Sequence, residues 1–209
     1  MVNFKKQYLY RMIHIENISH VLEYGITHRN STNANRNFIP IGDSSIITTR
    51  AGKALKNGKI LGDYIPFYFG YRFPMLYVIQ WGHNGVKQTL AEDIVYCVTT
   101  VEEIVNSNIP FIFTDGHAID SFSTQYTKDR INEIEHLLDW DAIQDMYWHD
   151  ENDLDKKRRK EAEFLLENDL PTNHILGYIC YNEKAKSKLV HFGIEEKKIV
   201  VRPNYYFSV

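Results

Sequence analysis

Short runs of β-branched and aromatic residues, most of them bounded by Gly, Pro or Asp, recur along the chain and limit the folds open to it. Such runs predict short strands, here over residues 8–13, 64–69, 75–79, 94–99, 111–114, 175–181 and 198–202. Apolar residues three and four apart predict helices over 15–24 (with Gly25 at its C-cap), 127–140 and 183–192. Many strands with few intervening helices favour a mixed α+β fold over a doubly wound parallel sheet.

Length and composition predict a single domain over residues 1–209. Of the 209 residues, 44% are hydrophobic and 13% aromatic, which is enough to bury one core. The formal net charge of −3 excludes a protein that binds nucleic acid through its global charge. Any contact with nucleic acid must therefore come from a local basic patch.

Several common sites are missing from the sequence. It has no H-E-x-x-H or paired C-x-x-C motif, so we expect no metal. It also has no G-x-S-x-G elbow, no Walker loop and no G-x-G-x-x-G fingerprint. These absences argue against metal enzymes, serine hydrolases and the two commonest nucleotide-binding loops.

A cytoplasmic protein is expected from the cysteines and the N-terminus. Cys97 and Cys180 each lie in an apolar run, which is typical of free, buried thiols in a reducing compartment. Residues 1–6 are not followed by the apolar region of a signal peptide, and no apolar run approaches the length of a membrane span. We expect no membrane contact.

Two long stretches show little regular pattern. Residues 27–46 are polar, rich in Asn, Ser and Thr, and without periodicity, which predicts a long functional loop. The interval between Thr114 and Lys160 has no clear strand signal, although its first part includes the expected helix over 127–140.

His14 and Arg50 are candidate site residues, each with a simpler alternative. His14 ends the first predicted strand, where it could bond a ribose hydroxyl or could simply be a half-buried histidine. Arg50 lies among small residues in 48–52, where its forked donors could clamp a phosphate. A surface arginine in a loop is the alternative.

Glu161 and Glu163 follow a basic run and precede apolar residues. If residues 161–166 are extended, both carboxylates project from one face of a strand, where they could stabilise a developing cation. A basic amphipathic helix with solvated glutamates fits the same pattern. The aromatic run 64–69 predicts a core strand on composition alone.

The basic run over residues 156–160 could contact nucleic-acid phosphates. Four acidic residues precede it, however, and nearly balance its charge: Asp150, Glu151, Asp153 and Asp155. A solvated loop therefore remains the alternative.

Taken in order, these pieces resemble the DarT family of DNA ADP-ribosyltransferases. The resemblance runs from about Tyr8 to the C-terminus, and the Asp-Tyr-Ile-Pro-Phe-Tyr-Phe block is its most specific part. The matching segments are residues 10–17, 21–26, 41–43, 50–52, 62–69, 74–76, 92–95, 110–117, 162–163 and 177–181.

This resemblance implies an ADP-ribosyltransferase fold, a split mixed β core around an NAD cleft with peripheral helices and a long substrate loop. DarT proteins are toxins with roles in phage defence, and they transfer ADP-ribose from NAD to a base in single-stranded DNA, thymidine in some members and guanosine in others. A macrodomain antitoxin, DarG, removes the mark. Residues 34–52 would form the NAD-binding element and residues 117–163 the substrate-recognition loop.

Site residues follow from the same resemblance. Glu163 and Arg50 would be catalytic, with Glu163 holding the ribose as the nicotinamide bond breaks. A guanidinium gives up its proton reluctantly, so Arg50 is easier to understand as an electrostatic clamp than as a base. The residues expected to hold NAD are His14, Ile15, Glu16, Glu23, Gly25, Arg50 and Tyr68.

The acceptor base must be reached in an unstacked strand, where aromatic residues such as Tyr126, Tyr147 and Trp148 can stack on it. The residues expected to contact DNA are His117, Tyr147, Trp148, Lys157, Arg158, Arg159 and Glu161. His117 could instead relay a proton, and Tyr147 and Trp148 could simply pack their loop. Transfer to protein or RNA, and an inactive NAD-binding module, remain alternative functions.

Overall fold

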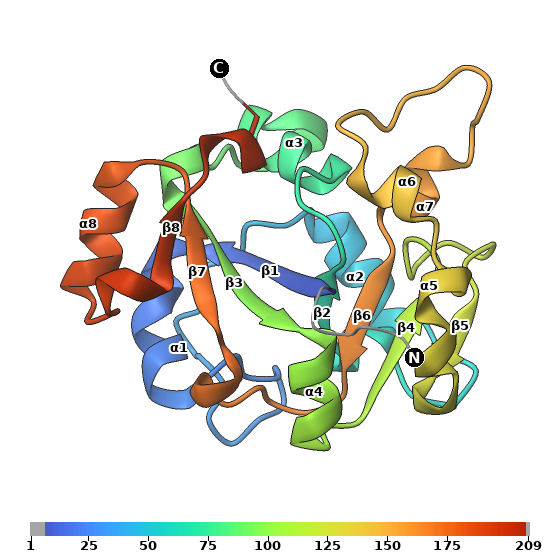
Figure 1. The fold of residues 1–209 in the computed structure, drawn as a ribbon, viewed down its shortest axis with the longest axis horizontal. Helices are drawn as coiled ribbons and strands as arrows, with labels where there is room; N and C mark the ends of the chain where they lie inside the picture. Colours follow the sequence, from blue (N-terminus) through green and yellow to red (C-terminus); the bar gives the residue numbers. More distant parts are fainter. Residues whose placement is uncertain (1–6, 208–209) are drawn as a thin grey trace.

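A mixed sheet of eight strands forms the centre of the computed structural model, which describes residues 7–207 (Figure 1). The expectation about a signal peptide in residues 1–6 lies outside them. The strand order is β5-β4-β6-β2-β1-β3-β7-β8. The strands are β1 (Tyr8–His14), β2 (Ile65–Tyr68), β3 (Ile94–Thr100), β4 (Phe111–Thr114), β5 (Gln125–Thr127), β6 (Glu163–Leu166), β7 (Gly177–Cys180) and β8 (Ile199–Val201).

The sheet is nearly divided between β1 and β2. These two strands pair at one position only, Tyr10 opposite Tyr68. By contrast, β1 pairs with β3 along its whole length, from Tyr8 to His14. All neighbouring strands are antiparallel except β7 and β8, which are parallel. The expected α+β fold with a split mixed β core is confirmed.

Short helices surround the sheet (Figure 1). They are α1 (Ile18–Tyr24), α2 (Ser44–Gly52), α3 (Pro74–Trp81), α4 (Val101–Ser107), α5 (Ile134–Leu137), α6 (Trp140–Gln144), α7 (Lys156–Lys160) and α8 (Glu183–His191). Within residues 7–207, none of the helices is long and apolar enough to cross a membrane.

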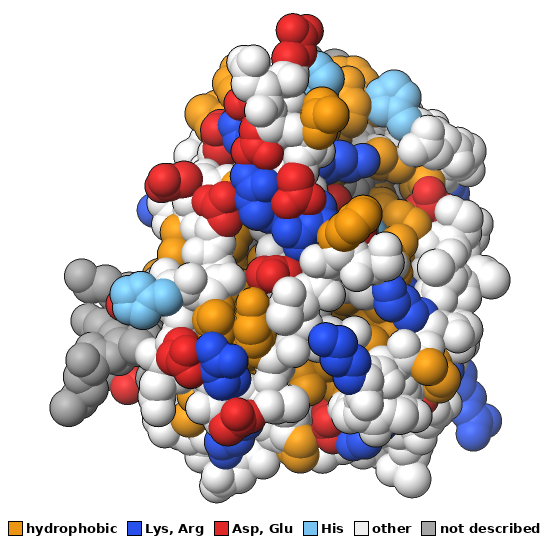
Figure 2. All heavy atoms as spheres, turned by 90° about the vertical axis from the view of Figure 1, so that its right-hand side faces the viewer, with side chains coloured by type: hydrophobic (Ala, Val, Ile, Leu, Met, Phe, Trp, Pro, Cys, Tyr) orange, Lys and Arg blue, Asp and Glu red, His pale blue; other side chains and the backbone are white. Residues whose placement is uncertain are grey.

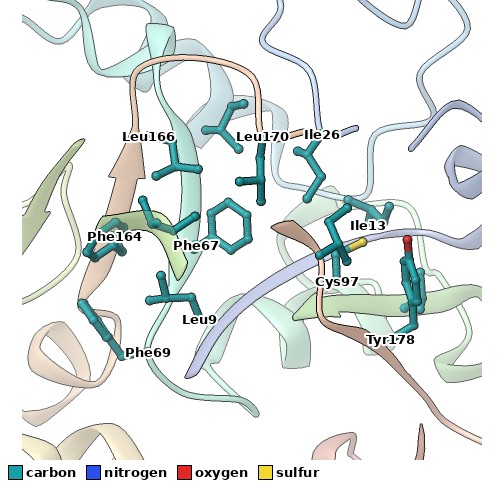
Figure 3. Packing of buried hydrophobic residues seen from close by; sticks show 14 of the residues in the cluster. Leu9, Ile13, Ile26, Phe67, Phe69, Cys97, Phe164, Leu166, Leu170 and Tyr178 are labelled. Atoms are coloured by element: carbon teal, nitrogen blue, oxygen red, sulfur yellow. The ribbon is translucent and has the colours of Figure 1, made fainter. Parts of the chain in front are cut away.

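The main hydrophobic core joins both halves of the sheet (Figure 3). Phe67 of β2 and Phe164 of β6 come from one half, and Leu9 of β1 and Cys97 of β3 from the other. Alternate residues of each strand point to this face, as the pleat requires. Cys97 and Cys180 are free and buried, as predicted.

Residues 75–79 form the middle of α3, so the strand predicted there is wrong. Pro74 occupies the first turn, where its missing N–H costs nothing, and Gly82 ends the helix in the left-handed region at φ 67°. Leu76 and Ile79, three residues apart, are buried on one face. The aromatic and β-branched residues of this run favoured a strand and concealed the helical spacing.

The helix predicted over 127–140 is broken into pieces. Residues 125–127 are β5, a strand that the sequence did not predict, and a 3-10 turn over Lys128–Glu133 leads into α5. Asp139 then caps α6 by accepting a hydrogen bond from the amide of Ala142. Leu138, with an extended backbone at φ −109° and ψ 144°, separates α5 from this new helix.

Two further boundaries differ from expectation. The irregular segment that begins at residue 27 ends at Asp43, because this residue caps α2 by accepting a hydrogen bond from the amide of Ser45. The segment after β3 forms α4, which was not predicted, and Thr100 caps it through the amide of Glu103.

Phe67 tests the core that joins the two halves. We expect Phe67→Ala to lower the free energy of unfolding by about 3–5 kcal/mol, because the fully buried ring leaves a cavity at the centre of the sheet. Leu90→Ala, at an exposed position, should change it by less than about 0.5 kcal/mol. Urea denaturation followed by circular dichroism measures both. Equal effects of the two variants would contradict the assignment of Phe67 to the core.

Candidate active site

A cavity of about 430 Å³ lies where β1 and β2 separate. Its walls include residues 11–13 of β1, and residues 64–66 and Tyr68 at β2, and the irregular segment before α2 closes it from another side. Ten residues between Ala34 and Arg50 line it, so the element predicted over 34–52 borders this cavity. The missing ladder between the two strands is what leaves room for a ligand.

Glu163 does not itself line this cavity, but its carboxylate contacts Arg50 and His117, which do. It is the first residue of β6, opposite Tyr68 of β2, and its exposed fraction is 0%. Its Oε2 accepts a hydrogen bond from Arg50 Nη1 at 2.8 Å, and its Oε1 accepts one from the amide of Ala118 at 2.8 Å. Each carboxylate oxygen is therefore fixed by one donor, and the group has one defined orientation.

Arg50 reaches Glu163 from the last turn of α2. Gly62 permits this approach, because a Cβ at this position would lie 2.8 Å from the Cα of Ala51. Burial by itself would lower the pKa of Arg50, but the adjacent Glu163 carboxylate raises it. Arg50 therefore stays a cation. Its Nη2 has no hydrogen-bond partner in residues 7–207.

His117 and Ala118 belong to the segment that follows β4. His117 Nε2 lies 3.8 Å from Glu163 Oε1, and burial lowers the pKa of the imidazole. Gly116 lets α7 approach this segment, since a Cβ there would lie 2.9 Å from the carbonyl oxygen of Arg158. The amide of His117 donates to that same carbonyl at 2.9 Å. A neutral imidazole thus lies next to a buried carboxylate.

Glu161 does not share an extended strand with Glu163. The strand begins at Glu163, whereas Glu161 follows α7 in a turn with φ −93° and ψ 27°. Both local interpretations were partly right, since the basic run is helical and the following residues are extended. Burial raises the pKa of the Glu161 carboxyl to about 8, an effect that Lys157 opposes and Glu163 reinforces.

The residues predicted to hold NAD fall into two groups. Gly25, Arg50 and Tyr68 line the cavity. His14, Ile15, Glu16 and Glu23 are not among the lining residues. His14 caps a 3-10 turn by accepting a hydrogen bond from the amide of Glu16, Ile15 is buried, and Glu23 is exposed on α1. For this second group a ligand-binding role stays a prediction.

Arg11 also lines the cavity, although it was not among the predicted site residues. Its Nη1 donates to the carbonyl oxygen of Pro66 at 3.0 Å, across the gap between β1 and β2, and its Nε has no partner in the described chain. The sequence held a signal. Arg11 is two residues from Leu9 and two from Ile13, so all three side chains share the inward face of the strand.

The aromatic residues predicted to contact DNA differ in exposure. Tyr147 is 69% exposed on the segment between α6 and α7. Trp148 packs against Tyr77 and Phe207, with ring centroids 5.6 Å from each, which is the alternative that the sequence left open. Tyr126 stacks on Phe113 with ring centroids 5.1 Å apart.

Most of the basic run is paired with carboxylates. Arg158 contacts Asp115 and Asp155, and Arg159 contacts three aspartates: Asp139, Asp153 and Asp155. Lys157 is exposed, and no ion pair involves it in the described part of the chain. Within residues 7–207 no group of three or more His, Cys, Asp or Glu side chains could hold a metal ion.

Comparison with known proteins places this geometry in context. A family model described as "ssDNA thymidine ADP-ribosyltransferase, DarT" matches residues 10–207. A DNA ADP-ribosyl transferase of Escherichia coli O127:H6 is 32% identical, covering 99% of this chain and 96% of its own length. A DNA ADP-ribosyl transferase–DNA ADP-ribosyl glycohydrolase fusion protein of Thermosipho africanus is 26% identical, covering 95% of this chain and 49% of its own length.

Solved structures of DarT from Thermus sp. 2.9 share the fold. The complex with ADP-ribosylated single-stranded DNA superposes with a TM-score of 0.84 at 26% identity, covering 97% of each chain. The complex with NAD⁺ superposes with a TM-score of 0.79 at 27% identity, covering 96% of this chain and 98% of the other.

Glu161 makes stability depend on pH in a predictable direction. The pKa of its carboxyl is about 8 in the folded protein, against an ordinary value of 4.5 for an exposed glutamate, so the folded state favours the protonated acid. This contribution to stability is present below about pH 4.5 and is lost as the pH rises through about 8. Because glutamine mimics the neutral acid, Glu161→Gln should gain stability relative to the unmodified protein as the pH rises from 5 to 8. Urea denaturation at several pH values measures the difference, and a constant difference would contradict it.

Proposed function

Because this chain belongs to the DarT family of DNA ADP-ribosyltransferases, we propose that it transfers ADP-ribose from NAD to the base of thymidine in single-stranded DNA, with Glu163 as the catalytic residue. The protein is an NAD-dependent DNA ADP-ribosyltransferase. The observation that carries the assignment of Glu163 is its environment: a fully buried carboxylate, oriented by the amide of Ala118 and by Arg50, which lines the cleft.

The cleft has the features that NAD requires. Arg11 and Arg50 both line it, and each keeps a buried guanidinium nitrogen without a partner in the described residues. Such donors suit the oxygens of a pyrophosphate or a ribose, which arginine binds through its forked geometry. The segment over 34–52, which we propose as the NAD-binding element, supplies much of the remaining lining.

Glu163 would act on the ribose next to nicotinamide. Loss of nicotinamide leaves positive charge on that ribose, and a fixed carboxylate in a water-poor site stabilises such charge. A carboxylate offers about four acceptor positions, and Arg50 and Ala118 use two of them. A position therefore remains for the 2′-hydroxyl of the ribose.

Arg50 and His117 have different proposed roles. Arg50 keeps its proton beside Glu163, which supports the role of a clamp that orients this carboxylate. His117 has a lowered pKa and is neutral near pH 7, so it can accept the proton that the acceptor base loses. Glu161, which is a neutral acid below about pH 8, would orient that base through a hydrogen bond.

The DNA side of the site would lie on the 117–163 segment. The exposed ring of Tyr147 and the ammonium of Lys157, which pairs with no carboxylate within residues 7–207, support this placement, whereas Trp148, Arg158 and Arg159 are engaged within the protein. A toxin role opposed by a DarG antitoxin is supported by the relative in which a DNA ADP-ribosyl glycohydrolase is fused to the transferase. A DNA substrate also fits a cytoplasmic location and a role in phage defence.

The acceptor is tested with NAD and single-stranded oligonucleotides in which each of the four bases is varied. We expect an adduct of ADP-ribose mass, found by mass spectrometry, only on oligonucleotides that contain thymidine. An adduct on guanosine would move the chain to the other acceptor class. Labelling of protein or RNA from NAD, without any DNA adduct, would contradict a DNA substrate.

Glu163→Gln should lower the rate of transfer to DNA by about 100-fold or more, because the negative charge that stabilises the ribose is removed. Loss of this charge also leaves Arg50 buried and unpaired, which costs about 3–5 kcal/mol of stability. Glu163→Asp keeps the charge but withdraws it from the ribose, and therefore separates catalysis from folding.

Glu167→Gln is the matched control. Glu167 follows β6, accepts a hydrogen bond from the Tyr64 hydroxyl and takes no part in the Arg50–Glu163 ion pair. This variant should keep transfer within a few-fold of the unmodified rate. Initial rates, with circular dichroism on every variant, give the comparison. Full transfer by folded Glu163→Gln would remove Glu163 from its role.

A further inference from the structure

An exposed phenylalanine projects from the segment between β4 and β5. Phe122 is 83% exposed, although phenylalanine is a residue that proteins usually bury. It is five residues from His117, whose imidazole lies beside Glu163. A single exposed apolar side chain is common on protein surfaces, so its meaning depends on how this segment is held and on what surrounds it.

The segment that carries Phe122 is fixed by hydrogen bonds. The amide of Phe122 donates to Asp120 Oδ1 at 2.9 Å, and Ser123 Oγ donates to the carbonyl oxygen of His117 at 2.8 Å. The amide of Thr124 donates to Asp115 Oδ1 at 2.8 Å. The backbone that carries the ring is therefore hydrogen-bonded directly to the segment of His117. A ring held in this way loses little conformational entropy when it binds a ligand.

The same segment contacts α7, and this places Lys157 nearby. Arg158 Nη1 donates to Ser123 Oγ at 3.2 Å and to Asp115 Oδ1 at 3.0 Å. Lys157 precedes Arg158 in α7, and its charge lowers the pKa of both His117 and Glu161. An ammonium group therefore lies on the catalytic side of this helix, near the base of the segment that carries Phe122.

Lys157 differs from the basic residues beside it. Lys156, Arg158 and Arg159 all form ion pairs, and the carboxylates around them outnumber them: Asp115, Asp139, Asp145, Asp150, Asp153 and Asp155. Figure 2 shows the face on the α5–α7 side of the molecule, where Lys and Arg side chains are interleaved with Asp and Glu. Lys160 is buried and donates to the carbonyl oxygens of Ile143 and Asp145. Within residues 7–207, Lys157 alone of this run is exposed and forms no ion pair, so its ammonium is available to a ligand.

We propose that Phe122 is a stacking platform for a base adjacent to the modified one, and that Lys157 is the one residue of the basic run that contacts a phosphate of the same strand. The inference rests on the proposed single-stranded DNA substrate and names the residues that recognise it. An unstacked strand offers flat bases and phosphates in alternation, and an exposed aromatic ring and an ammonium on two segments that contact each other match this chemistry. Phe122 and Lys157 act in binding and positioning, since neither touches the reacting atoms.

The ring is tested by four substitutions of Phe122. Phe122→Ala and Phe122→Leu should weaken binding of a fluorescent thymidine-containing oligonucleotide about 5- to 150-fold, because both remove the flat face. Phe122→Trp and Phe122→Tyr should keep the affinity, because both retain it. The KM for the oligonucleotide should rise with the loss of affinity, while the KM for NAD stays unchanged. Leu90→Ala is the control, since it removes exposed apolar surface away from this segment.

The phosphate contact is tested by the salt dependence of binding. Lys157→Ala should reduce the slope of log affinity against log salt concentration by about 0.7, the value for one contact on a single strand. Lys198→Ala, which removes an exposed lysine beside β8 at the opposite edge of the sheet, should leave the slope unchanged.

Equal affinity of Phe122→Ala, Phe122→Leu and the unmodified protein would overturn the role of Phe122, and an unchanged salt slope in Lys157→Ala would overturn that of Lys157. Both outcomes are read only where the unmodified protein modifies DNA. Failure of the unmodified protein to modify any oligonucleotide contradicts the proposed function instead, so the two failures are distinct.

Discussion

The buried ion pair between Arg50 and Glu163 is the contact on which the arrangement of the site depends. It joins α2, on one side of the cleft, to the start of β6, deep in the sheet. Taking two charges out of water is costly, and removing either partner leaves the other uncompensated. The pair is therefore weak evidence for stability and strong evidence for a site, because it holds a buried carboxylate in one orientation beside a residue that lines the cavity.

Other features of the fold serve this pair. Gly62 allows α2 to lie close enough for Arg50 to reach inward, and Gly116 allows α7 to lie against the segment that supplies the amide of Ala118. Thr114 Oγ1 accepts a hydrogen bond from the amide of Glu163 at 3.2 Å. The carboxylate is thus held from its backbone and from both oxygens by residues distant in sequence. Such multiple support is what a preorganised catalytic group requires.

The sequence predicted the strands better than the helices, for a physical reason. β3 and β4 consist almost entirely of β-branched and aromatic residues, so their composition identifies them without knowledge of their partners. α3 has a similar composition, and only Pro74, Gly82 and the spacing of its buried residues distinguish it. Asp139 caps α6 locally, but its side chain also accepts a hydrogen bond from Arg159, 20 residues away, and no local pattern reveals that contact.

The sequence predicted the site residues that belong to family motifs, but not those whose role depends on ion pairs formed in the fold. Glu163 and Arg50 came from the ordered motifs, and the structure brings them into contact. The basic run looked uniform in sequence, yet the aspartates of the fold engage Arg158 and Arg159 and leave Lys157 apart from these pairs. Similarly, Glu161 and Glu163 are two residues apart but belong to a turn and a strand. Which charge is free depends on contacts between distant segments, and local spacing does not contain that information.

The single residue pair that joins β1 to β2 has a mechanical consequence. Elsewhere in the sheet, rows of backbone hydrogen bonds transmit force between strands, but at this seam the two halves are coupled mainly by side chains and by the connecting chain. A ligand that contacts both walls of the seam therefore links the two halves where backbone hydrogen bonds are missing, and this makes the sheet stiffer. A ligand in the cleft should then stabilise both halves of the protein together, because it binds the folded state.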